Sequence, residues 1–326
     1  MTLRGALTRL LADGEPHPEA ALAAALGLAP SALAAELDGL AAWGLAAGRD
    51  GARGWRLPAP LDLIDRAGLE AALGAAARGR LERLELEDET DSTNARLLAL
   101  HGLAPGRCRV ALAEYQRAGR GRRGRDWLQP FGSGLCLSLG WLFPAPPPAL
   151  GALSLAAGVA TLRALARFGV TGLSLKWPND VLRDGGKLGG ILSELRLEAA
   201  GPAYVVVGVG LNGRLPPALV REIVAAGGAP PAALGDPLPS RTALAAALID
   251  ELVAALVEFQ ARGFAPFVAE WSRADALRDR SVRVHGTDRV REGIARGIGP
   301  DGTLCVEIGG RLESLAAGEV TLRAVA

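Results

Sequence analysis

"GKLGGILSELRLEAAGPAYVVVGVGLN", residues 186–212, contains two apolar runs that each have the length and the Val, Ile and Leu content of a β-strand. Only Ala-Ala-Gly-Pro separates the two runs, 186–198 and 203–212, which leaves no room for a crossover helix. Strands that follow each other without a helix favour a mixed sheet over regular β-α-β winding. The stretch therefore predicts an α+β fold for the middle of the chain.

The segments on either side complete a predicted central domain, residues 64–272. Further strands are expected at 109–116, 134–143 and 173–177, and long helices at 154–169 and 241–263. Two GxGxxG matches, Gly119–Gly124 and Gly208–Gly213, lack the full β-α-β context of a dinucleotide site, and no GxxxxGK[ST] motif exists. We interpret both matches as accidents of a glycine-rich chain.

A hairpin is predicted at residues 176–190, KWPNDVLRDGGKLGG, which hold the only two lysines among thirty-six basic residues. Pro178 forces the residue before it out of the helical region, and Asp184-Gly185-Gly186 is typical of a tight turn. The strand after this turn is expected to run back beside the strand before it. That brings four polar residues to one end of the sheet: Lys176, Asn179, Asp180 and Lys187. One carboxylate between two ammonium groups suggests polyphosphate or metal–nucleotide binding, and the alternative is a solvent-facing hairpin with a few ion pairs.

A second polar segment, EYQRAGRGRRGRDW at residues 114–127, interleaves five arginines with three glycines. Glycine lets a backbone approach a ligand closely, and the planar guanidinium group binds phosphate or carboxylate through paired hydrogen bonds. Predicted strands flank the segment, so it is an internal loop and not a basic tail. It predicts an anion-binding loop, and the alternative is a solvated basic loop.

Three small polar residues, Ser92, Thr93 and Asn94, stand where a predicted strand gives way to a helix. These residue types are typical of helix N-caps. The free N–H groups of a helix N-terminus can also bind a polar ligand. Taken alone, the three residues favour the cap.

Residues 1–63 predict three short helices followed by a hairpin around Asp50-Gly51, which is the pattern of a winged helix-turn-helix domain. The third helix, 30–44, has no Lys, Arg, Gln or Asn and carries Glu36 and Asp38. A recognition helix of this composition lacks the usual donors to base edges and phosphates. We therefore expect binding of this domain to DNA to be weak or lost.

The last part of the chain, residues 273–326, alternates short apolar segments with glycine-rich turns such as Pro300-Asp301-Gly302. This pattern predicts a small β-barrel. Together the three parts give an α+β chain with a winged helix-turn-helix, a central mixed sheet and a terminal barrel.

Composition narrows the functional classes. A formal net charge of +1 gives no global field toward nucleic acid or membrane. The three cysteines and three histidines are scattered, without CxxC spacing, which disfavours a metal site or a disulfide framework. No signal peptide or long apolar span is recognisable, so we expect a cytoplasmic location and no membrane partner.

Five motifs occur in a fixed order along the chain: STN at 92–94, EYQRAGRGRRGRDW at 114–127, KWPND at 176–180, GGKLGGIL at 185–192 and GVGLN at 208–212. With this order and spacing the chain resembles the biotin–protein ligases, in particular their bifunctional ligase/repressor members. The resemblance spans nearly the whole chain and implies a biotin/lipoate ligase-like catalytic domain with an SH3-like C-terminal barrel. It implies that ATP activates biotin as biotinyl-5′-AMP. Biotin then passes to a lysine of the biotin carboxyl carrier protein of acetyl-CoA carboxylase.

The resemblance also implies roles for individual residues. Biotin contacts are implied for Ser92, Thr93, Asn94, Gln116, Arg120, Gly121, Arg122 and Lys187. Contacts with ATP or the adenylate are implied for Arg120, Arg122, Lys176, Asn179, Lys187 and Asn212. The implied catalytic residues are Arg122, Lys187 and Asp180, with Asp180 also the implied ligand of Mg²⁺. A compact ammonium group can follow a carboxylate as it becomes a mixed anhydride, whereas a planar guanidinium is bulkier.

Two departures from the family and two other hypotheses accompany this interpretation. The acidic third helix makes operator repression, and so a role for operator DNA as a partner, weak or lost. The other departure concerns adenine. Family members stack a tryptophan on adenine, but residues 213–258 contain no aromatic side chain, so the Pro and Ala residues of 225–235 would have to cover the base. The alternatives are a DNA-binding transcriptional regulator with a ligand-sensing middle domain, and a lipoate–protein ligase. Family members can dimerise through the central sheet, so a homodimer is a further candidate assembly.

Overall fold

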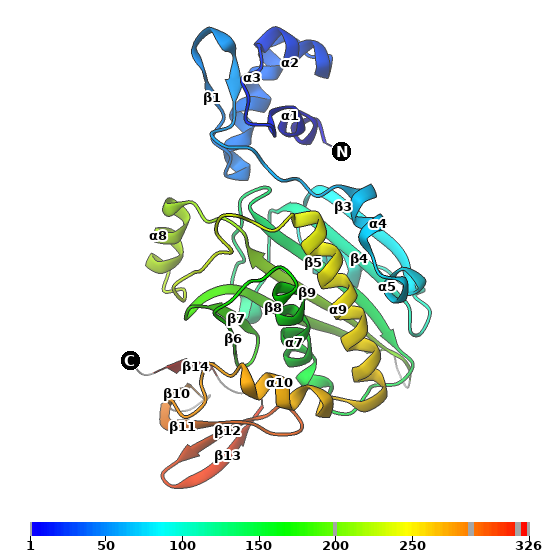
Figure 1. Ribbon diagram of the computed structural model, residues 1–326, viewed down its shortest axis with the longest axis vertical. Helices are drawn as coiled ribbons and strands as arrows, with labels where there is room; N and C mark the ends of the chain where they lie inside the picture. The colour runs from blue at the N-terminus through cyan, green and yellow to red at the C-terminus, as the bar shows by residue number, and fades with distance from the viewer. Residues whose placement is uncertain (1, 198–200, 286–289, 317–320, 325–326) are drawn as a thin grey trace.

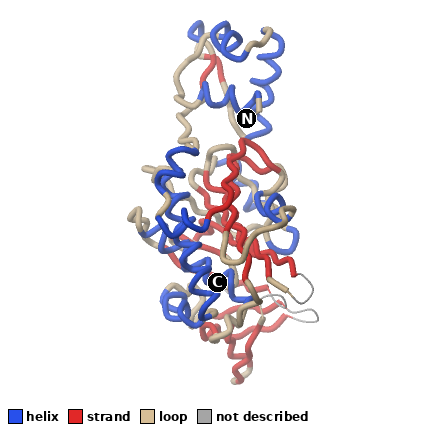
Figure 2. The backbone as a smooth tube through the Cα atoms, turned by 90° about the vertical axis from the view of Figure 1, so that its right-hand side faces the viewer, coloured by secondary structure: helices blue, strands red, loops and turns tan. Residues whose placement is uncertain are grey.

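The computed structural model describes residues 2–197, 201–285, 290–316 and 321–324. Its three parts follow one another along the long axis, with the N-terminal helices at one end and a small sheet at the other (Figure 1). Figure 2 shows the same order from the side, with strands concentrated in the middle and at the C-terminal end.

The middle of the molecule is a seven-stranded sheet with the order β3-β4-β5-β9-β8-β7-β6. Its strands are β3 (Leu81–Thr90), β4 (Cys108–Gln116), β5 (Gly134–Phe143), β6 (Leu173–Lys176), β7 (Asp180–Arg183), β8 (Gly186–Leu197) and β9 (Ala203–Asn212). Only β3 and β4 run parallel; the other neighbours are antiparallel. The mixed sheet predicted from residues 186–212 is therefore confirmed.

Helices cover both faces of this sheet. On one face lie α7 (Leu153–Ala166) and α9 (Arg241–Arg262), whose apolar side chains form the main core with β5 and β8. On the other face α6 (Thr93–Leu98) packs against β4, β5 and β9. The other α-helices of this middle part are α4 (Arg66–Ala72), α5 (Ala75–Arg80), α8 (Pro217–Ala225) and α10 (Val268–Arg273).

The hairpin at residues 176–190 differs from its prediction in one respect. An extra strand, β7, lies between the two predicted strands, so β8 pairs with β7 and β7 pairs with β6. The chain turns between β6 and β7 at a cis Trp177-Pro178 bond, and between β7 and β8 at Asp184-Gly185, both of which have positive φ. The prediction missed β7 because a four-residue strand between two turns is too short to show a recognisable alternation of apolar and polar residues.

A buried ion pair joins the sheet to α9 and to the segment before α4. Arg241 and Glu114 have side chains 3% and 0% exposed, with 2.6 Å between Nη2 and Oε2. Arg241 also donates to the carbonyl oxygens of Gly134 at 2.7 Å and Asp62 at 2.6 Å, and the Ile64 N–H donates to Glu114 at 2.8 Å. Residues 62–64, just before α4, are thus tied into the core.

The N-terminal helices and hairpin lie where the sequence predicts them. They are α1 (Leu3–Leu11), α2 (Glu19–Leu26), α3 (Pro30–Gly39), β1 (Gly48–Arg49) and β2 (Trp55–Arg56). Their core extends into the central domain, because Trp43 stacks on Phe131 with ring centroids 4.5 Å apart. Arg9 also pairs with Asp88 of β3 at 2.8 Å. These contacts anchor the N-terminal part beside the ends of β3 and β4.

The C-terminal part is a five-stranded antiparallel sheet with the order β13-β12-β11-β10-β14. Its strands are β10 (Ser281–His285), β11 (Val290–Ile298), β12 (Leu304–Ile308), β13 (Arg311–Leu315) and β14 (Thr321–Ala324). Within the residues that the structure describes, no pairing joins β13 to β14. Its apolar side chains belong to the main core, and the Trp177 indole donates to the Gly302 carbonyl oxygen at 3.1 Å.

We predict that Arg241→Ala lowers the free energy of unfolding by about 3–5 kcal/mol, because it leaves the Glu114 carboxylate buried without its cation. The measurement is the urea midpoint followed by circular dichroism. Arg262→Ala in the same helix is the matched control. It removes a pair with Glu258 whose side chains are 68% and 33% exposed, so it should cost less than about 1 kcal/mol. Equal midpoints for the two variants would contradict the stabilising role of the buried pair.

Candidate functional site

The strand register places six residues on one line across six strands of the central sheet. The line, called the site row below, runs through Ala113, Cys136, Gly210, Gly190, Asp180 and Lys176. Paired residues on neighbouring strands point to the same face of a sheet, so these side chains share one face. It is the face on which α6 packs, because Ser138, two residues after Cys136, bonds to Thr93 and Asn94. The row thus has small residues in its middle and charged residues at one end.

Trp127, the last residue of the arginine-glycine segment, lies over the small residues of the site row. A Cβ added to Gly210 would stand 2.6 Å from the Trp127 ring, and one added to Gly190 would stand 3.7 Å from it. The first distance is shorter than real Cβ contacts, so Gly210 is required for the indole to lie this close to the sheet. The indole N–H donates to Gln129 Oε1 at 3.2 Å.

The charged end of the row contains the predicted lysine–carboxylate cluster. Lys187 Nζ lies 2.7 Å from Asp180 Oδ1, and Lys176 is the register partner of Asp180 on the neighbouring strand. Arg122 completes this end: burial lowers its pKa, as does the charge of Arg123, whereas Asp180 opposes both effects. The hairpin therefore does bring Lys176, Asp180 and Lys187 together, with Arg122 from the loop beside them.

The opposite end carries a chain of polar contacts from α6 to β4 and β5. Gln116 Oε1 accepts from the Thr93 N–H at 2.8 Å and lies 3.1 Å from the Thr93 hydroxyl. Ser138 Oγ lies 2.7 Å from Thr93 Oγ1 and 2.5 Å from Asn94 Oδ1. Cys136 lies between this chain and Trp127. Burial raises the pKa of its thiol to about 12, although hydrogen bonds with Trp127 and Gln116 act in the opposite direction.

The arginine-glycine segment forms a short hairpin-like loop. An isolated antiparallel β-bridge pairs the backbones of Arg120 and Asp126. The Gly121 N–H donates to the Arg125 carbonyl oxygen at 2.6 Å, and the Trp127 N–H donates to the Gly119 carbonyl oxygen at 2.8 Å. Arg120 reaches the sheet through an ion pair with Glu194 at 3.5 Å. Another of its arginines, Arg117, points elsewhere and pairs with Glu89 and Asp91.

Three predicted site residues use their polar groups to hold the backbone. Asn179 donates to the Ile191 carbonyl oxygen at 2.9 Å. Asn212 donates to the carbonyl oxygens of Lys187 at 3.2 Å and Ala232 at 3.0 Å. Ser92 caps α6 by accepting from the Ala95 N–H at 3.4 Å. These contacts fix the strands that carry Lys187 and the helix that carries Thr93.

Several residues that the sequence did not assign face the same side: Trp127, Gln129, Cys136, Ser138 and Glu194. Trp127 carried a signal, because aromatics make up only 4% of the chain. The others become recognisable only from the strand register, which the sequence does not reveal. Gln129 is 6% exposed and its Nε2 has no hydrogen-bond partner among the described residues.

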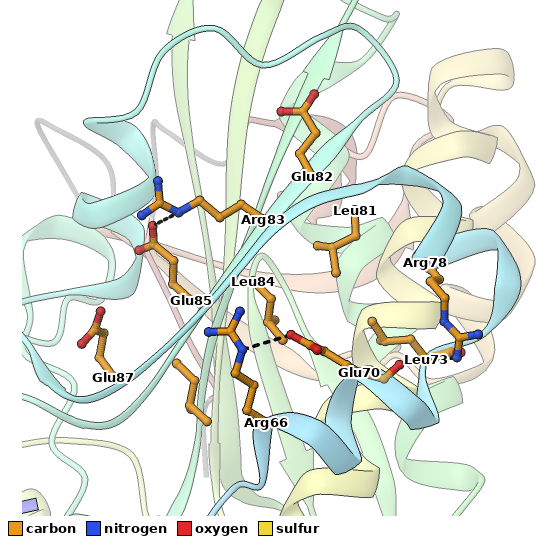
Figure 3. Close-up of a pocket in the computed structure, with 11 residues that line it drawn as sticks. Arg66, Glu70, Leu73, Arg78, Leu81, Glu82, Arg83, Leu84, Glu85 and Glu87 are labelled. Carbon is orange, nitrogen blue, oxygen red and sulfur yellow. Dashed lines mark hydrogen bonds and ion pairs between the residues drawn. The ribbon is translucent and has the colours of Figure 1, made fainter. Parts of the chain in front are cut away.

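A hollow lies elsewhere, along the outer edge of β3. It measures about 660 Å³ and is lined by residues of α4, α5 and β3, including Arg66, Glu70 and Leu84 (Figure 3). None of the predicted site residues lines it. At the site row the Trp127 indole covers the middle. The chemistry of the side chains therefore locates the site better than empty volume does.

Two absences among the described residues bear on metal sites and membranes. No group of three or more His, Cys, Asp or Glu side chains there could hold a metal ion. No single helix among them is long and apolar enough to cross a membrane, and one bent pair, Glu19–Leu26 with Pro30–Trp43, passes that test only by length and composition.

Comparison with known proteins defines the class of protein to which the chain belongs. The model of the biotin/lipoate A/B protein ligase family matches residues 88–212, which contain the site row and the arginine-glycine segment. The model of the biotin protein ligase C terminal domain matches residues 279–323.

Individual relatives narrow this class to one family. The bifunctional ligase/repressor BirA of Escherichia coli K12 is 36% identical over 318 residues, which cover 97% of this chain and 96% of the relative. The biotin--[acetyl-CoA-carboxylase] ligase of Mycobacterium tuberculosis is 41% identical over 272 residues, 80% of this chain and 95% of the relative. The structure of the biotin protein ligase from Aquifex aeolicus in complex with biotin and ATP is similar with a TM-score of 0.60 and 25% identity, covering 75% of this chain and 100% of that chain. The chain belongs to the biotin–protein ligase family.

We predict that Gly210→Ala weakens biotin binding at least about tenfold, because the added methyl group displaces the Trp127 indole. Isothermal titration with biotin measures the effect. Gly79→Ala in α5 is the control, since a Cβ there meets nothing within 4 Å. Wild-type affinity in the Gly210 variant would contradict the position assigned to Trp127.

Proposed function

We propose that this chain is an ATP-dependent biotin–protein ligase whose reaction takes place along the site row. The observation that carries the proposal is the row itself. It joins a cationic end, where Lys187 pairs with Asp180 at 2.7 Å, to a neutral polar cluster beside its other end, formed by Gln116, Thr93 and Ser138. Biotin has the same polarity: a neutral ring system rich in hydrogen-bonding groups, and a carboxylate at the end of an apolar chain.

In the first step a carboxylate oxygen of biotin attacks the α-phosphorus of ATP. A new P–O bond forms, the bond to the pyrophosphate leaving group breaks, and the products are biotinyl-5′-AMP and pyrophosphate. No protein nucleophile or proton transfer is needed, so catalysis rests on alignment and on stabilising negative charge. Lys187 and Arg122 supply the positive charge that stabilises it. Lys176, Asn179 and Asn212 belong to the nucleotide side.

Magnesium enters as part of the MgATP substrate. Mg²⁺ takes oxygen ligands and commonly keeps one or two protein carboxylates beside substrate phosphates. Asp180 fits this pattern, because its carboxylate already lies beside Lys187 and near Arg122 at the cationic end. We assign Asp180 as the protein ligand of this ion.

In the second step the amine of an acceptor lysine attacks the acyl carbonyl of the adenylate. An amide bond forms, the bond to AMP breaks, and the amine loses a proton. We propose the biotin carboxyl carrier protein of acetyl-CoA carboxylase as the acceptor, as the name of the Mycobacterium tuberculosis relative suggests. The Ser92–Asn94, Gln116 and Arg120–Arg122 segments bind the biotin moiety, with Gly121 giving the loop its close approach.

We further propose that residues 1–63 form a winged helix-turn-helix domain, that 64–272 form the catalytic domain and that 273–326 form an SH3-like module. Repressor activity would be weak or lost. In addition to the acidic third helix, each arginine of residues 2–63 already pairs with a carboxylate: Arg4 with Glu36, Arg9 with Asp88, Arg49 with Glu19, and Arg53 and Arg56 with Asp50. Phosphate contacts would have to displace these pairs.

A gel shift with the promoter of the chain's own biotin genes should give only weak, sequence-independent binding. Tight, specific binding that biotin and ATP strengthen would contradict the proposal.

The activity is tested by ATP–pyrophosphate exchange with biotin, lipoate and octanoate compared at equal concentration. We expect exchange with biotin to be at least about tenfold faster than with either alternative, because the polar end of the row matches the ring system of biotin. Exchange with lipoate alone would favour the lipoate ligase, and no exchange with any acid would favour a ligand-sensing regulator.

The same assay tests the role of Lys187. Lys187→Arg keeps the charge but replaces a compact ammonium group by a planar fork, so exchange should fall about 100-fold. The urea midpoint checks that the variant is folded. A variant that exchanges at the wild-type rate would remove Lys187 from the mechanism.

A further inference from the structure

Glu194 of β8 faces the site but has no role in the scheme above. It lies on the same face of the strand as Gly190, and its side chain is 25% exposed. Its carboxylate makes two contacts with elements that are far apart in the sequence. Oε2 accepts from Asn94 Nδ2 of α6 at 2.8 Å, and Oε1 lies 3.5 Å from Arg120 Nη1 of the arginine-glycine segment.

The contact with Asn94 decides how that side chain is oriented. Asn94 is 4% exposed and its second donor contact is with the Leu192 carbonyl oxygen at 3.1 Å. Its carbonyl oxygen lies 2.5 Å from Ser138 Oγ, which continues to Thr93 and Gln116. Glu194 therefore anchors the buried end of the polar chain that holds the biotin ring in the proposed reaction. Without it, one N–H of Asn94 loses its partner and the carboxamide can rotate.

The contact with Arg120 concerns the opposite side of the ligand. Arg120 is exposed, and its ion pair with Glu194 is longer than a hydrogen bond, so the pair stabilises the loop only weakly. It nevertheless keeps the loop against the sheet, and an incoming carboxylate or phosphate can take the place of Glu194. The Asn94 contact is the stronger of the two, because it is shorter, more deeply buried and made by an ionised acceptor.

We propose that Glu194 is a positioning residue that holds the ring-binding side chains through Asn94 and the arginine-glycine loop through Arg120. The proposal rests on the proposed function, since it assigns the residue to biotin binding. Glu194 itself touches neither the carboxylate nor the phosphate that react. Its two oxygens serve two different ends of the same ligand, which lets substitutions separate the two contacts.

Two substitutions and one control separate the contact of Glu194 with Asn94 from its contact with Arg120. Glu194→Ala removes both contacts, and Glu194→Gln keeps an acceptor for Asn94 while removing the charge that holds Arg120. Glu87→Gln is the matched control, because Glu87 of β3 makes a similarly long pair, 3.6 Å, with Arg96, and neither residue is assigned to the site. All three changes leave the core untouched.

The kinetic arm measures KM and kcat in biotin-dependent exchange. Glu194→Ala should raise KM for biotin about tenfold, whereas Glu194→Gln should stay within about threefold of wild type, since the acceptor for Asn94 is retained. The Glu87 variant should match wild type. A wild-type KM in Glu194→Ala, or an equal rise in the Glu87 control, would overturn the contact with Asn94 as a determinant of biotin binding.

The second arm needs no substrate and so stands apart from the proposed activity. Trypsin cleaves after the exposed arginines of the loop, and mass spectrometry follows the rate of cuts after residues 120–125. Both Glu194 variants should be cut about two- to fivefold faster than wild type without ligand. Unchanged cleavage would refute the role in holding the loop. Absence of biotin-dependent exchange in the wild type would refute the proposed function and leave the result of this arm unaffected.

Discussion

The site depends on one constraint: the register of six strands that puts Ala113, Cys136, Gly210, Gly190, Asp180 and Lys176 on a single line. A shift of one residue in any strand would turn its member of the line to the opposite face. The small residues give the indole of Trp127 a flat surface, and the charged residues stand at the end of that surface. A polar ring system and a reactive carboxylate can therefore be held on one rigid plane.

Rigidity comes from contacts outside the row. The buried pair of Glu114 and Arg241 joins β4 to α9, and Arg241 also bonds to Gly134 at the start of β5. Glu114 stands two residues before Gln116, and Gly134 stands two residues before Cys136. The N-terminal part adds Trp43, which stacks on Phe131 just after the arginine-glycine segment. The segment is thus fixed at its base, and Arg120 adds a weak ion pair with Glu194 of the sheet. A loop of this kind can respond to an anionic ligand without disturbing the sheet.

The sequence predicted the mixed sheet, the long helices and the lysine–carboxylate cluster because those features depend on local patterns and short turns. It missed β7, which is four residues long, and gave no bounds for the strand expected before Ser92, which is β3, whose glutamates and arginines are unusual in strands. It also missed Trp127, Cys136 and Glu194 as neighbours of the site. Their proximity depends on which strands pair and in which register, and those are long-range contacts that no local pattern encodes.

The most direct test of the account is an experimental structure of the chain with biotin bound. The account predicts that the ring lies against Trp127 beside Gln116 and Thr93, and that the carboxylate is within hydrogen-bonding distance of Lys187 Nζ. Biotin bound in the hollow along β3, or with its carboxylate directed away from Lys187 and Asp180, would contradict it.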